Sequence, residues 1–111
     1  MKKLRFKRKY FLMIQSDGKT LECRVNYPSL RKIRKGDQIK FFWESLSEIV
    51  EIIDIREYQS FRTMLNNENV AKLVPGMSKS QALAEYEAIY SKQKVAENDG
   101  IVILEFKIIC E

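Results

Sequence analysis

The residues with the clearest potential for chemistry lie in the segment from Lys19 to Arg24, where a lysine, a glutamate and an arginine fall within six residues. Three charged groups of both signs are costly to gather unless they pair with one another or bind a ligand. Together an ammonium, a carboxylate and a guanidinium can hydrogen-bond a polar ring such as a nucleobase. Lys19, Glu22 and Arg24 are therefore the first candidates for ligand binding. If the protein is an enzyme, Lys19 is the candidate catalytic amine and Glu22 the candidate general base.

Strand alternation separates these charges from their apolar neighbours. In an extended strand Glu22 and Arg24 share one face, while Leu21, Cys23 and Val25 share the other. The apolar set is the natural core face, which leaves the two charged residues facing a cleft or solvent. On spacing alone two interpretations stay open: an exposed ion pair, which is common and worth little, or a polar cleft.

Positive charge is concentrated in the first third of the chain. Residues 1–35 contain 12 lysines and arginines against two acidic residues, whereas residues 36–111 contain 8 against 13. This asymmetry indicates a polyanionic partner, because neutralised phosphates release counterions, and a solvated basic arm is the alternative. The candidate contacts to a nucleic-acid backbone come from two clusters: Lys7, Arg8, Lys9, Arg31, Lys32, Arg34 and Lys35.

Several function classes are excluded by composition. Histidine is absent, which excludes Ser-His-Asp and Cys-His catalysis. Two cysteines, Cys23 and Cys110, make neither a zinc site nor a disulfide framework. No apolar run reaches the length of a membrane span, and residues 1–9 are too charged for the apolar part of a signal peptide. We expect a cytoplasmic protein with reduced cysteines and no cofactor, metal or membrane partner.

Aromatic side chains offer a second, weaker indication of a ligand, because unpaired bases stack on them. Phe41, Trp43 and Phe61 are assigned to the core. Tyr58 and Tyr90 are the better ligand candidates, since a phenol needs a polar partner and often lies at the rim of a cleft.

Local patterns predict several short strands with helices inserted between them. Strands are expected at residues 3–7, 21–25, 38–43, 48–55 and 101–109. Helices are expected around residues 10–14, after Ser60, and after Ser78, which forms a capping box with Gln81. The nearly continuous apolar run at residues 48–55 predicts a strand covered on both faces. Residues 1–111 therefore form a single α+β domain that fits a small mixed β-barrel.

In this order the segments resemble the ASCH family (activating signal cointegrator homology), whose fold is PUA-like. The family pattern is a glycine, a lysine and Glu-x-Arg, followed by a basic or polar loop and Gly-Asp-x-Ile-x-Phe. Matching segments run through nearly the whole chain: Gly18–Arg24, Gly36–Phe41, Tyr58–Phe61, Glu85–Tyr90 and Gly100–Phe106. The resemblance implies a PUA-like barrel with inserted helices, in which Lys19, Glu22 and Arg24 line the cleft.

One branch of that family hydrolyses an acetylated cytidine with a lysine, a threonine three residues later and a glutamate before the last helix. Lys19 matches the lysine, but Glu22 occupies the threonine position and Pro75 lies near the glutamate position. Proline carries no acid or base, and a carboxylate does not replace a hydroxyl nucleophile without a different mechanism. Glu68, several residues earlier, would serve only with a shifted alignment. The sequence therefore predicts no acetylcytidine amidohydrolase activity.

Three functional hypotheses remain. The favoured one is a module that binds RNA or a modified nucleoside through the cleft of Lys19, Glu22 and Arg24. The alternatives are an amidohydrolase-like enzyme acting on a modified nucleoside, and a protein-interaction module whose basic face docks an acidic partner. Salt dependence and nucleotide competition separate nucleic-acid from protein partners, and turnover of a nucleoside panel separates an enzyme from a binder.

Overall fold

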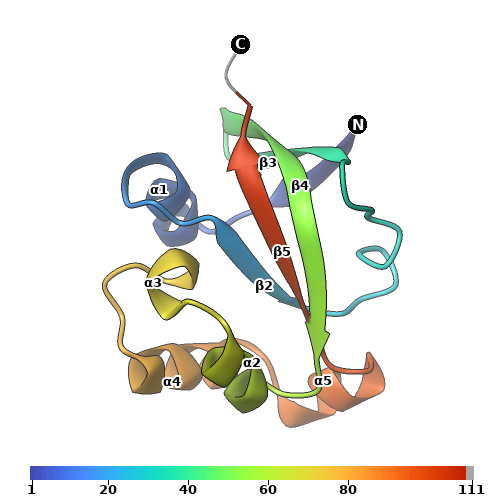
Figure 1. Cartoon of the computed structure of the whole chain (residues 1–111), viewed down its shortest axis with the longest axis vertical. Coiled ribbons are helices and arrows are strands. Elements are labelled where there is room, and N and C mark those ends of the chain that lie inside the picture. Colours follow the sequence, from blue (N-terminus) through green and yellow to red (C-terminus); the bar gives the residue numbers. More distant parts are fainter. Residues whose placement is uncertain (110–111) are drawn as a thin grey trace.

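A mixed five-stranded sheet organises the part of the chain that the computed structural model describes, residues 1–109 (Figure 1). The strand order is β1-β3-β4-β5-β2; β1 and β3 are parallel, and the other neighbouring pairs are antiparallel. The sheet curls into a half-barrel, so the expected small, mixed barrel architecture is confirmed. The strands are β1 (Lys2–Arg5), β2 (Leu21–Val25), β3 (Gln38–Trp43), β4 (Leu46–Tyr58) and β5 (Ile101–Ile108).

Five helices are inserted between the strands within residues 1–109. They are α1 (Arg8–Ser16), α2 (Phe61–Asn67), α3 (Val70–Leu73), α4 (Lys79–Ile89) and α5 (Lys92–Glu97). Ser60 and Ser78 cap α2 and α4 as predicted, and the capping box of Ser78 with Gln81 is complete. The sequence did not predict α3 and α5, because helices of four and six residues are too short to show a periodic apolar face.

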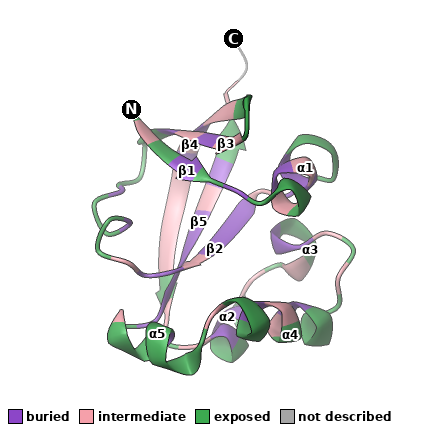
Figure 2. Ribbon diagram, turned by 180° about the vertical axis from the view of Figure 1, so that it is seen from behind, coloured by how far each residue is buried: buried purple, intermediate pink, exposed green. Residues whose placement is uncertain are grey.

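Two clusters of buried apolar side chains lie on the two faces of β5. Val102, Leu104 and Phe106 belong to the first cluster, which packs with α1 and β3 inside the half-barrel. Ile101 and Ile103 belong to the second, which packs with the helices α2 to α5. In Figure 2 the buried residues accordingly follow β5 and β2, with α2, α4 and α5 grouped at one end of the sheet.

The strand covered on both faces is therefore β5, and the prediction that placed residues 48–55 in this role was wrong. In β4 only Val50 and Ile52 are buried, both in the first cluster. The other face of β4 stays half-exposed because the second cluster packs against β2 and β5 instead. Phe41 and Phe61 are buried as predicted, and Trp43 is half-buried against the first cluster. No helix among residues 1–109 combines the length and the hydropathy that a bilayer span requires.

Candidate functional site

The turn between α1 and β2 positions Lys19. Gly18 adopts a φ of 81°, a conformation that glycine accepts without steric cost. The backbone N–H of Lys19 then donates to the carbonyl oxygen of Met13 at 3.1 Å, and the N–H of Thr20 donates to the carbonyl oxygen of Lys72 at 2.9 Å. These bonds tie the start of β2 to both α1 and α3, so the direction of the Lys19 side chain is set by the backbone.

The side chain of Lys19 is completely buried. Its ammonium donates to the carbonyl oxygens of Leu21 and, at 2.7 Å, Leu73, and Oε1 of Glu22 lies 3.1 Å away. Burial lowers the pKa of Lys19, and the neighbouring Glu22 carboxylate opposes that shift. Since an ammonium has three protons, three acceptors satisfy it completely. Lys19 thus holds the turn and Glu22 in place from inside the protein.

Glu22 joins Lys19 to Arg24. The second carboxylate oxygen of Glu22, Oε2, accepts from Nε of Arg24 at 2.7 Å. The guanidinium of Arg24 lies 4.7 Å from the ring centre of Phe6, and its Nη2 donates to the carbonyl oxygen of Arg5 at 2.7 Å. The strand parity inferred from the sequence is therefore confirmed: Glu22 and Arg24 point the same way, and the three charged groups form a continuous relay.

This relay crosses the opening of the half-barrel. β1 and β2 are the two edge strands of the sheet. The N–H of Phe6 donates to the carbonyl oxygen of Phe42 in β3. Because successive residues of a strand direct their backbone groups to opposite sides, the N–H and C=O of Arg5 point to the free edge of β1. The bond from Arg24 to the Arg5 carbonyl therefore links the two free edges. We call the line along which β1 and β2 face each other the seam; Figure 2 shows the two strands from this side, with α1 and the loop of residues 26–37 on either side of them.

A cavity of about 170 Å³, the seam cavity, opens between β1, β2, α1 and the end of α4. An engineered cavity of about 150 Å³ is known to hold a benzene molecule, so the seam cavity has room for a single aromatic ring. Its lining combines aromatic, charged and backbone groups: Arg5, Phe6, Lys7, Tyr10, Glu22, Cys23, Arg24, Tyr86, Ile89 and Tyr90.

Two residues in the lining offer polar groups that are free to bind a ligand. Tyr86 lines the cavity and is only 4% exposed. Its hydroxyl forms no hydrogen bond within residues 1–109 and is not fully enclosed by protein. The backbone groups of Thr20 and Asn26, on either side of β2, hydrogen-bond to Phe106 and Gly100 at the two ends of the pairing with β5. The even-numbered residues of β2 therefore direct their backbone groups to β5, and the N–H and C=O of the odd-numbered Cys23 point to the free edge. Polar groups that converge on a cavity without a partner indicate a place for a polar ligand.

The phenols around the cavity are held in their neutral form. Burial raises the pKa of Tyr10 and of Tyr86, and raises that of Tyr90 to about 12. The hydroxyl of Tyr10 also donates to Oε2 of Glu85 at 2.7 Å. Burial likewise raises the pKa of the Cys23 thiol well above its ordinary value, which leaves that thiol protonated and unreactive at neutral pH. The other cysteine, Cys110, lies outside the described residues.

The other predicted ligand-binding residues have different positions. Tyr90 lines the seam cavity with Glu22 and Arg24, whereas Lys19 lies behind them. Tyr58 lies outside the lining, where its hydroxyl donates to Oε2 of Glu68 at 2.5 Å. Tyr10 and Tyr86 also line the cavity. The sequence analysis did not select them as ligand-binding residues, because helical spacing does not mark which aromatic residue reaches a cavity.

Glu68 belongs to a separate network on β4. Both of its carboxylate oxygens accept from Arg56 at 2.7 Å, and Nη1 of Arg56 also contacts Asp54 and Glu105 at 2.8 Å. One guanidinium therefore binds three carboxylates, which leaves this network with a net negative charge. Across residues 1–109 no set of three His, Cys, Asp or Glu side chains is arranged to hold a metal ion.

The side chains of the two predicted phosphate-binding clusters fall into two groups: some contact other parts of the protein, and others extend into solvent. Lys9 pairs with Glu85 at 2.5 Å, and Arg8 lies 5.8 Å from the ring centre of Trp43. Lys7 lines the seam cavity.

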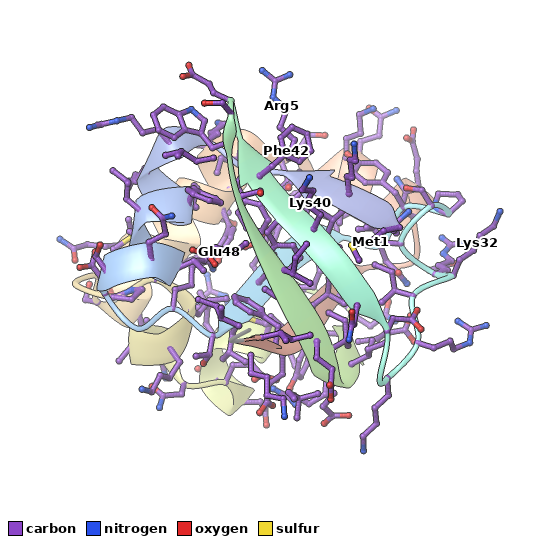
Figure 3. The ribbon with its side chains drawn as sticks, turned by 90° about the horizontal axis from the view of Figure 1, so that it is seen from above. Met1, Arg5, Lys32, Lys40, Phe42 and Glu48 are labelled. Atoms are coloured by element: carbon purple, nitrogen blue, oxygen red, sulfur yellow. The ribbon has the colours of Figure 1, made fainter. Side chains whose placement is uncertain are left out.

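In the loop after β2, Arg31 and Arg34 are engaged with the backbone. Arg31 donates to the carbonyl oxygens of Asn26 and Asn98 at 3.1 and 3.0 Å, and Arg34 donates to that of Arg31 at 2.7 Å. Lys32 extends away from the body of the protein in Figure 3. Only part of the predicted phosphate-binding set therefore points freely into solvent.

Comparisons with known proteins agree with this architecture. The chain matches the family model of the ASCH domain over residues 4–109. Among solved structures, it is similar to the crystal structure of hypothetical protein PH0355, with a TM-score of 0.85 and 28% identity over 98% of this chain and 100% of that one. It is also similar to the solution NMR structure of protein PF0455 from Pyrococcus furiosus, with a TM-score of 0.76 and 27% identity over 99% of this chain and 98% of that one. No curated protein matches the sequence. The chain belongs to the ASCH domain family.

Proposed function

We propose that the protein binds RNA and takes one unpaired base into the seam cavity. The observation that carries this proposal is a cavity of about 170 Å³ with aromatic walls and unpartnered polar groups. Sequence-specific recognition of RNA targets unpaired bases, which stack on aromatic side chains and hydrogen-bond through their edges. The family supports the same class of ligand, since ASCH domains are generally proposed to bind RNA.

The polar groups in the lining complement the edge of a base. The backbone of Cys23 offers one donor and one acceptor on neighbouring positions, and the hydroxyl of Tyr86 offers either. Arg24 adds a charged donor that is already oriented by Glu22 and Arg5. Because the relay holds Arg24 before any ligand arrives, little side-chain entropy is lost on binding.

Phosphate contacts are assigned to basic side chains around this opening. Arg5 and Lys7 line the cavity itself, and Lys32 and Lys35 belong to the exposed part of the loop between β2 and β3. Phosphate contacts of this kind strengthen binding to any sequence, whereas the base contacts inside the cavity select among bases.

The test is fluorescence anisotropy with a mixed-sequence single-stranded RNA about 12 nucleotides long, enough to span a single-stranded binding site. Tyr86→Phe removes only the unpartnered hydroxyl, and we expect it to weaken binding about fivefold to tenfold, since a hydrogen bond is worth about 1 kcal/mol and 1.4 kcal/mol is a factor of ten. Tyr27→Phe is the matched control, because Tyr27 packs against the second cluster outside the cavity. If Tyr86→Phe and Tyr27→Phe both bind as the wild type does, the base does not enter the seam cavity.

A further inference from the structure

We infer that the RNA strand continues from the seam cavity across Tyr90 into a second, larger hollow, so that the ligand is a single-stranded oligonucleotide. This inference rests on the proposed function and adds to it the extent of the ligand and a second binding site.

The second hollow has a volume of about 760 Å³ and lies among α2, α4 and α5, which group together at one end of the sheet (Figure 1). This volume falls in the range of about 300–1,000 Å³ that is typical of small-molecule sites and is enough for a nucleotide, whereas the seam cavity takes only a ring. Tyr90 lines both cavities, so the two are adjacent and share this residue. The hollow is lined by Gln59, Ser60, Phe61, Arg62, Leu83, Glu87, Tyr90, Ser91, Lys92, Val95, Ala96 and Gly100.

The ring of Tyr90, which both cavities share, is held by stacking. It lies 5.9 Å from the ring of Phe61 at an interplanar angle of 24°, and Phe61 stacks in turn on Tyr86 at 5.1 Å and 8°. The stacking of both tyrosines on Phe61 holds the aromatic rings in a defined orientation. Aromatic platforms of this kind carry successive bases of single-stranded nucleic acid.

The charge of the hollow favours a polyanion. Arg62 and Lys92 line it, and neither forms an ion pair within residues 1–109, while Glu87 is the acidic residue in the lining. Residues 36–111 as a whole carry 8 basic against 13 acidic residues, whereas the lining of the hollow contains two basic residues and one acidic residue. Free cations beside an aromatic platform match the phosphates of a strand whose bases stack.

Chemical-shift mapping by NMR locates the ligand directly. Cytidine, uridine, adenosine and guanosine, and then trinucleotides of the same bases, are titrated into the ¹⁵N-labelled protein. We expect nucleosides to shift the backbone amides of Cys23 and Arg24, and trinucleotides to shift in addition those of Arg62 and Lys92. Trinucleotides that leave the Arg62 and Lys92 amides unmoved while shifting that of Cys23 overturn the inference and leave the proposed function intact.

Variants test the same point by affinity. The double variant Arg62→Ala with Lys92→Ala should lose about tenfold in affinity for a hexanucleotide, as expected when phosphate contacts are removed, while its nucleoside-induced shifts stay as in the wild type. The matched control is Lys94→Ala with Lys107→Ala, which removes the same charge from exposed residues outside both cavities. If the two double variants lose the same affinity for the hexanucleotide, the loss reflects the change in net charge alone, and the inference is overturned. If neither nucleosides nor oligonucleotides bind the wild-type protein, the proposed function falls with it.

Discussion

At the scale of single residues, Glu22 is the member of the relay on which the others depend. It is the carboxylate between two cations, with Lys19 fully buried on one side and Arg24 about one-fifth exposed on the other. Lys19 has carbonyl partners besides Glu22, but a carbonyl carries no net charge. The relay is therefore a structural element of the half-barrel as well as a wall of the cavity, which the sequence alone had left open.

Glu22→Gln is expected to lower the free energy of unfolding by about 3–5 kcal/mol, because it leaves a buried ammonium without its counter-charge. Arg24→Met is expected to cost only about 1 kcal/mol, because Glu22 keeps Lys19 and the methionine keeps much of the apolar contact with Phe6. Urea denaturation measures both, with the exposed Glu87→Gln as control. Equal, small losses in Glu22→Gln and Arg24→Met would show that the relay contributes little to stability.

The same residues predict the outcome of an enzymatic assay. Incubation with N4-acetylcytidine should release no cytidine above the uncatalysed background, because Glu22 stands where a threonine nucleophile is required and Lys19 is enclosed by three acceptors. Liquid chromatography of timed samples measures the product. Enzyme-dependent release of cytidine that is lost in Lys19→Met would contradict this prediction and place the reaction at the relay.

At the scale of elements, the junction between α5 and β5 is the most demanding turn in the fold. Gly100 has a φ of +97°, and a Cβ built there would lie 2.2 Å from the carbonyl oxygen of Tyr58 at the end of β4. This close approach lets β5 begin its pairing with β4 at Ile101. Only glycine allows both the conformation and the contact.

Gly100→Ala is therefore expected to lower the free energy of unfolding by more than about 3 kcal/mol, since backbone must move to admit the methyl group. Gly36→Ala is the matched control: Gly36 has a φ of +93° but nothing within 4 Å of its added Cβ, so only the conformational cost of about 1–2 kcal/mol applies. Thermal or urea unfolding compares the two. If Gly100→Ala and Gly36→Ala lower the free energy of unfolding equally, the close approach of Gly100 to the end of β4 adds no cost and the prediction is wrong.

The connection between α2 and α3 is held to β4 by an acid-sensitive pair. Hydrogen bonds from Arg56 hold the pKa of Glu68 below its ordinary value of 4.5, despite opposition from burial. A lowered folded-state pKa gives stability that is present above pH 4.5 and is lost as the pH falls through the folded pKa. The thermal midpoint should thus fall as the pH drops below 4.5. Glu68→Gln should weaken this dependence of the midpoint on pH. The control Glu44→Gln, in the exposed turn before β4, should leave the dependence unchanged. An unchanged pH profile in Glu68→Gln would contradict the role of this pair.

At the scale of the whole molecule, the excess of positive charge in residues 1–35 is expected to govern RNA affinity. Arg31 and Arg34 hold the loop through backbone carbonyls, so Lys32 and Lys35 are the side chains whose charge can be reversed without loosening it. Lys32→Glu with Lys35→Glu should weaken binding to all RNA sequences alike and reduce the slope of log K against log salt by about 0.7 for each phosphate that the variant no longer neutralises. Anisotropy titrations between about 50 and 200 mM salt measure this slope, with Lys94→Glu and Lys107→Glu as control. A reduction in affinity that depends on sequence would assign these lysines to base recognition.

The sequence by itself determined most of the architecture and indicated which charged residues group together in the relay. The bounds of β2 and β3, the caps at Ser60 and Ser78 and the shared direction of Glu22 and Arg24 follow from local rules: strand alternation, turn glycines and side-chain capping. Such rules act between residues a few positions apart, and they need no knowledge of the rest of the chain. The ASCH family was evident for the same reason, since its pattern is a local order of residues.

Only the tertiary structure decided which side chains share a cavity. Tyr86 and Tyr90 reach the seam from α4 and its C-terminal end, far along the chain from Cys23, and Tyr58, an equal candidate in sequence, bonds to Glu68 instead. Lys19 became a buried support because a carbonyl from α3, that of Leu73, lies beside it. Contacts between distant segments depend on how the sheet curls and where the helices pack, and residue spacing along one segment carries no record of either.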